Sequence, residues 1–104
     1  MNLVKRITRD YVVVHIRKNS DCYKNRNPPK KDVDAMMEAM KKYDTPWWES
    51  KNSKEVASYQ IFEPVLLVPF PVLHEGTERL LEREVQSSEF AYMDALRQEA
   101  VRAM

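Results

Sequence analysis

The sequence contains one glycine, one cysteine and no apolar run of the roughly 20 residues needed to cross a bilayer. Glycine supplies the positive φ angles of tight hairpins and phosphate-binding loops, so its scarcity argues against both and favours helices. A lone Cys22 excludes an internal disulfide. The N-terminus lacks the apolar region of a signal peptide, so we expect a cytoplasmic protein with no membrane segment.

The chain has 104 residues, of which 43% are hydrophobic, which predicts a single small globular domain over residues 1–104. Its longest apolar stretch, residues 63–73, is interrupted by Pro64, Pro69 and Pro71. Because prolines lack the amide hydrogens of a central strand, we predict an extended connector or short edge strand crossing the middle of the core.

Two segments near the N-terminus have the composition of β-strands. Residues 3–7 and 11–17 both resemble strands, and the second segment is rich in β-branched and aromatic residues. We therefore predict an α+β fold, with one or two N-terminal β-strands followed by three or four α-helices packed around residues 63–73.

Helices are predicted over residues 31–43, 71–83 and 89–103 from their apolar periodicity. The clearest is the first, in which apolar residues recur at i, i+3, i+4 and i+7 (Val33, Met36, Met37 and Met40). Acidic residues near its start and lysines near its end agree with the helix dipole.

Residues 53–62 allow two interpretations. Asn52-Ser53 followed by Glu55 is typical of a capped helix start, and Pro64 stops the segment. Alternation of apolar and polar residues over positions 57–61 would instead suit a strand. The capping pattern favours the helix.

Charge is distributed unevenly along the chain. Residues 1–31 hold nine basic and two acidic groups, a balance of +7, whereas residues 32–104 hold eight basic and fourteen acidic groups, a balance of −6. This asymmetry predicts either a polyanionic partner or pairing between the two halves. Within the basic part, residues 18–31 are expected to form an irregular loop that could be flexible.

No pattern in the sequence indicates catalysis or metal binding. Cys22 and His15 have no evident orienting partner, so a free loop cysteine is favoured over a nucleophile. His74 and Glu78 have i, i+4 spacing, but a zinc helix usually adds another His or Cys, so a solvated helix face is favoured. We predict a non-enzymatic protein without catalytic residues, cofactor or metal.

Adjacent tryptophans suggest a binding site. Side chains alternate along an extended segment, so we expect one of Trp47 and Trp48 in the core and the other exposed as a hot spot. The alternative is that both are half-buried under a loop. The leading hypothesis is a protein partner bound through an exposed aromatic and basic patch (Trp47, Trp48, Tyr23 and Arg26).

The alternative function is nucleic-acid binding by the basic segment 5–31. Its expected contacts are the cations of that segment (Lys18, Lys24, Arg26, Lys30 and Lys31). A homo-oligomer formed through a helical face also stays open. Small size, high charge and absent motifs are typical of a phage or mobile-element accessory protein or inhibitor, although no motif supports this interpretation.

Overall fold

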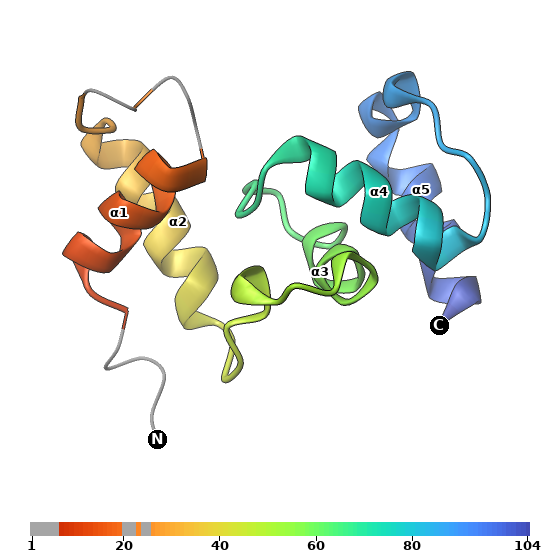
Figure 1. Ribbon diagram of the computed structural model, residues 1–104, viewed down its shortest axis with the longest axis horizontal. Helices are drawn as coiled ribbons and strands as arrows, with labels where there is room; N and C mark the ends of the chain where they lie inside the picture. The colour runs from red at the N-terminus through yellow and green to blue at the C-terminus, as the bar shows by residue number, and fades with distance from the viewer. Residues whose placement is uncertain (1–6, 20–22, 24–25) are drawn as a thin grey trace. The chain divides into compact units, whose positions relative to one another are not determined.

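The computed structural model describes residues 7–19, 23 and 26–104, and these residues form helices and connecting segments with no strand (Figure 1). The elements in chain order are α1 (Arg9–Asn19), α2 (Lys30–Lys41), the 3-10 helix η3 (Trp47–Glu49), α3 (Ser53–Gln60), α4 (Phe70–Leu81), the 3-10 helix η4 (Ser87–Ala91) and α5 (Met93–Ala103). The predicted α+β fold is therefore wrong for the described part of the chain, which is all-helical.

Residues 11–17, predicted as a strand, lie inside α1. Val12 and Ile16 are buried one helical turn apart, whereas Val14 is 64% exposed. Asp10 in the first turn and basic residues in the last turn favour the helix dipole. Tertiary burial of one helical face thus overrides the β propensity of a valine run. The other predicted strand, residues 3–7, lies outside the described residues except for Ile7, which is buried in an irregular segment.

The chain divides into two compact units, Met1–Pro46 with Val65–Pro69 and Trp47–Pro64 with Phe70–Met104. In the first unit α1 contacts α2, and the two helices cross in Figure 1. The buried apolar side chains of this unit come from both helices, from the segment before α1 and from the returning segment (Ile7, Val12, Ile16, Val33, Ala39, Met40, Leu67 and Val68). His15 joins α1 to that segment, because its Nε2 lies 2.5 Å from the Leu67 carbonyl oxygen.

In the second unit, α4 contacts both α3 and α5. The Asn52 side chain accepts hydrogen bonds from the amides of Lys54 and Glu55, at 3.1 and 3.3 Å. This cap confirms the helical interpretation of residues 53–62. A core cluster fills the space between the C-terminal end of α3, α4 and α5 (Ile61, Leu80, Val85, Leu96 and Ala100).

The apolar stretch at residues 63–73 does not act as one central segment. Residues Val65–Pro69 belong to the first unit, where Leu67 and Val68 are buried, and α4 of the second unit begins at Phe70. No strand forms in this stretch. The predicted helices 31–43 and 71–83 are confirmed within two residues at each end. The helix predicted over 89–103 is split into η4 and α5.

Candidate functional site

Both tryptophans point inward. Trp47 is 1% exposed and Trp48 is 5% exposed, with their ring centroids 5.6 Å apart in an edge-on arrangement. Trp47 also stacks on Tyr59, at 5.4 Å between centroids. The expectation of one exposed tryptophan is therefore wrong. In the 3-10 helix η3, neighbouring side chains are turned by about 120° rather than by the 180° of an extended segment, so both rings can reach the same core.

Tyr23 and Arg26, two other residues predicted to contact a partner, lie together in the first unit. The Arg26 guanidinium carbon is 5.3 Å from the centroid of the Tyr23 ring, a cation–π contact. The Tyr23 hydroxyl donates to Asp32 Oδ2 at 3.1 Å, and Arg17 Nε donates to the Tyr23 carbonyl oxygen at 3.3 Å. Tyr23 therefore connects the end of α1 to the start of α2.

Most of the cations predicted to bind nucleic acid lie near this connection. Lys18 is in the last turn of α1, Lys30 and Lys31 open α2, and all three are exposed, as is Arg26. Among the described residues, none of these three lysines takes part in an ion pair. Lys24 lies outside the described residues. Residues 18–31, which were expected to form a loop, thus begin in α1 and end in α2. Lys18, Lys30 and Lys31 lie on these two helices.

The charge asymmetry follows the two units. The first unit holds eleven basic and six acidic groups, a net charge of +5, and the second holds six basic and ten acidic groups, a net charge of −4. The two units therefore carry net charges of opposite sign.

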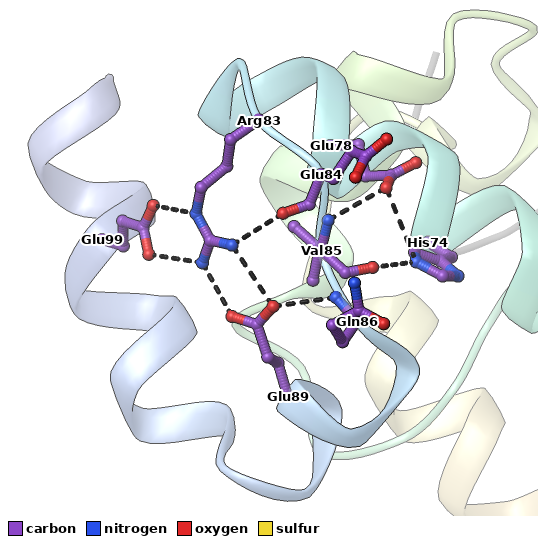
Figure 2. A network of polar contacts seen from close by, with 8 residues as sticks. All are labelled: His74, Glu78, Arg83, Glu84, Val85, Gln86, Glu89 and Glu99. Carbon is purple, nitrogen blue, oxygen red and sulfur yellow. Dashed lines mark hydrogen bonds and ion pairs between the residues drawn. The ribbon is translucent and has the colours of Figure 1, made fainter.

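A polar network in the second unit centres on Arg83, just beyond α4 (Figure 2). Its guanidinium uses all five N–H groups. Nε and Nη2 donate to the two oxygens of Glu99 at 2.7 and 2.8 Å. Nη2 and Nη1 donate to the two oxygens of Glu89 at 2.8 and 3.2 Å, and Nη1 also donates to the Glu84 carbonyl oxygen at 2.8 Å.

These contacts change the proton affinity of all three groups. The hydrogen bonds to Glu99 and Glu89 raise the pKa of Arg83 above its ordinary value. The hydrogen bonds from Arg83 lower the pKa of Glu89 and that of Glu99. Glu89 and Glu99, which come from η4 and α5, could not be recognised from the sequence as the partners of Arg83.

His74 and Glu78, considered as a metal pair, are occupied by the backbone of Val85. His74 Nε2 donates to the Val85 carbonyl oxygen, and Glu78 Oε2 accepts from the Val85 amide at 2.9 Å (Figure 2). The same Glu78 oxygen lies 3.8 Å from His74 Nε2. Within residues 7–19, 23 and 26–104, no three His, Cys, Asp or Glu side chains are grouped to hold a metal ion.

Cys22, considered with His15 as a thiol–imidazole pair, lies outside the described residues. His15 contacts Leu67 and Asn19. In the described part of the chain, every helix is too short or too polar to cross a membrane.

The most exposed aromatic residue among those described was not identified from the sequence. Tyr92, which precedes α5, is 72% exposed. Its position between two helices in the chain offered no pattern that would distinguish it from a core residue. No protein-family model, curated protein or solved structure matches this chain, so its function must be inferred from its own residues.

Proposed function

We propose that this chain is a non-enzymatic interaction protein that binds an acidic surface of a protein partner. The contact lies on the first unit, on what we call the basic surface (Lys18, Tyr23, Arg26, Lys30 and Lys31). The observation that carries the proposal is the bridge made by Tyr23, which holds the end of α1 and the start of α2 together beside exposed lysines.

Preorganisation supports this proposal. Arg26 lies over the Tyr23 ring, and Asp32 accepts the Tyr23 hydroxyl, so the centre of the basic surface has a defined geometry. A partner therefore meets an ordered contact and does not have to order this part of the surface on binding. The lysines around it supply charge complementarity, which raises association rates and selects partners.

Two features favour a protein over a nucleic acid. The Tyr23 ring is half-buried beneath Arg26, whereas base stacking requires an open aromatic face. Carboxylates also lie among the cations, with Asp32 bonded to Tyr23 and Asp34 paired with Arg9. Their negative charge disfavours the approach of closely spaced phosphates.

Nucleic-acid binding is the second candidate function. It is supported by the exposed lysines without ion pairs among the described residues, and by the net charge of +5 on the first unit. Phosphate contacts need cations and little else, so this surface could follow a backbone without stacking.

The chain offers a matched pair of variants for the test. Lys30→Gln/Lys31→Gln removes two charges from the basic surface, and Lys41→Gln/Lys42→Gln removes two charges at the other end of α2. Immobilised wild-type chain and both variants are compared for retained proteins by quantitative mass spectrometry, and each candidate is then titrated as a purified protein. A partner lost only from the Lys30/Lys31 variant supports the proposal. Equal retention by all three chains contradicts it.

Labelled single- and double-stranded DNA and RNA are titrated with the same three chains, at low and physiological salt. Fluorescence anisotropy that falls steeply with salt and is lost in the Lys30/Lys31 variant would establish the second candidate. Absence of binding at low salt would rule out nucleic-acid binding.

A further inference from the structure

A second exposed surface lies around Tyr92 at the start of α5. Two shallow hollows adjoin this residue. The first, of about 280 Å³, is lined by Glu89, Tyr92, Ala95, Leu96 and Glu99. The second, of about 510 Å³, is lined by Ala91, Tyr92, Met93, Asp94 and Ala95. We call the ring and both hollows the Tyr92 surface. It combines an open aromatic ring with small apolar residues and a carboxylate rim.

The carboxylates of the first hollow carry more negative charge than their partner neutralises. Glu89 and Glu99 share one cation, Arg83, and all five N–H groups of Arg83 are already used. The side chains of Glu89 and Glu99 are 33% and 37% exposed, so a second cation can reach them. This trio has a net charge of −1, and Arg102 of α5 lies near Glu99 as a further cation.

The same carboxylates also have acceptor capacity left. Together they accept four hydrogen bonds from Arg83 and one from the Gln86 amide. Two carboxylates offer about eight lone-pair positions, so about three positions remain. Several donors on one cationic group would match this arrangement better than a single donor.

We propose that the Tyr92 surface binds an arginine side chain presented by a partner protein. A guanidinium is planar, stacks on an aromatic face and donates to carboxylates through a fork of N–H groups. Its aliphatic arm would lie over Ala95 and Leu96. Charge complementarity favours this occupant, because the second unit has a net charge of −4, and the Asp94 side chain on the other rim, which pairs with Arg97 at 3.3 Å, is 95% exposed.

This surface is separate from the basic surface in both position and charge. It lies on the second unit and selects a cationic group, whereas the basic surface selects an acidic one. The inference therefore goes beyond the proposed function, and either one can fail without the other.

The probe is a short capped peptide with one arginine between alanines, titrated into isotope-labelled full-length chain and followed by two-dimensional NMR at low salt. We expect saturable shifts at Tyr92, Ala95 and Glu99. Replacing arginine by citrulline, its neutral isostere, should weaken binding by about tenfold or more, because charge-assisted hydrogen bonds are lost.

Variants distinguish the contribution of the Tyr92 ring to binding from an effect on folding. Tyr92→Ala should weaken peptide binding by about fivefold, whereas Tyr92→Phe, which keeps the ring face, should bind like wild type. Val101→Ala, another exposed position on α5, and Lys30→Gln/Lys31→Gln should leave binding unchanged. Absence of saturable shifts, equal binding of the citrulline peptide, or unchanged binding by a folded Tyr92→Ala chain would overturn the proposal.

Discussion

Gly76 of α4 lies so close to Ser53, the first residue of α3, that a β-carbon on Gly76 would be 2.0 Å from the Ser53 carbonyl oxygen. The same atom would be 2.9 Å from the Ala57 β-carbon. Both distances are below van der Waals contact, and the first neighbour is backbone, which cannot rotate away. The one glycine of the chain thus allows α3 and α4 to approach each other at this point.

Gly76→Ala should therefore destabilise the second unit although alanine is the better helix former. Overpacking in a core costs about 1–3 kcal/mol or more, against a propensity gain of about 1 kcal/mol. Urea unfolding followed by tryptophan fluorescence measures the change, since Trp47 and Trp48 lie in this unit. Glu75→Ala, at an exposed position of α4, is the control and should change the free energy of unfolding little. A variant as stable as wild type would contradict this close approach.

Glu82→Gly should stabilise the chain. Glu82 follows α4 with a φ of 56°, in the left-handed region, and the Arg83 amide donates to the Glu78 carbonyl oxygen at 3.2 Å, as in a Schellman cap. Glycine adopts this conformation without strain, so we expect a gain of about 0.5–1 kcal/mol after its larger unfolded-state entropy is included. Glu84→Gly, in the following segment, should give no gain. Thermal unfolding distinguishes the two, and equal effects would argue against strain at Glu82.

Trp47→Ala should lower the free energy of unfolding by about 3–5 kcal/mol, because a buried aromatic ring is replaced by a cavity. Its stacking contact with Tyr59 is lost as well. The reduced stability should appear in chemical unfolding followed by circular dichroism. Loss of partner binding in this variant would accordingly report unfolding, not removal of a contact. Full stability of the variant would show that the ring is not buried.

His74→Phe tests the link between α4 and the segment before η4. Phenylalanine can keep the ring contacts with Phe70 and Phe90, but it cannot donate to the Val85 carbonyl oxygen. Leaving a carbonyl of buried Val85 without this donor should cost about 1–3 kcal/mol. His74→Ala removes both contributions and should be less stable still. If His74→Phe unfolds at the same urea concentration as wild type, the hydrogen bond from His74 to Val85 contributes nothing to the free energy of unfolding.

The Arg83 network predicts a pH dependence with a definite sign. Hydrogen bonds from Arg83 lower the folded-state pKa of Glu89 and that of Glu99 below the ordinary value of 4.5. The folded state therefore binds fewer protons than the unfolded state in this range. The stabilisation is fully present above pH 4.5 and is lost as the pH falls through the lowered folded-state values.

Melting temperatures measured between neutral pH and acid check this dependence. Arg83→Gln should flatten the decline below pH 4.5, because the pKa of each carboxylate then returns toward its unfolded value. Arg79→Gln is the matched control, since Arg79 pairs only with exposed Glu75 in the described contacts. An identical acid decline in wild type and Arg83→Gln would rule out this network as its source.

Local sequence patterns were sufficient to predict several helices. The apolar stripe of α2 and the Asn52 cap of α3 are made by residues within one or two turns of each other, so their physical causes can be recognised in the sequence. The charge asymmetry was likewise visible in the sequence, although its division between two units was not.

The candidate sites were only partly predictable. Tyr23 and Arg26 were identified by residue type, and their contact follows from a separation of three residues. Trp47 and Trp48 were assigned to an extended segment, and the 3-10 turn that buries both depends on packing against Tyr59 of α3. The Tyr92 surface was missed, because exposure is a property of the packed chain.

The helices with strong local patterns and the distribution of charge along the chain could be predicted from residues close together in the sequence. Three features depend on long-range packing: the valine run of α1 is helical, Gly76 allows a close helix contact, and Arg83 joins Glu89 to Glu99. The physical reason is the range of the interactions. Caps and apolar stripes act between neighbours in the chain, whereas burial, backbone approach and ion pairing depend on residues that folding brings together.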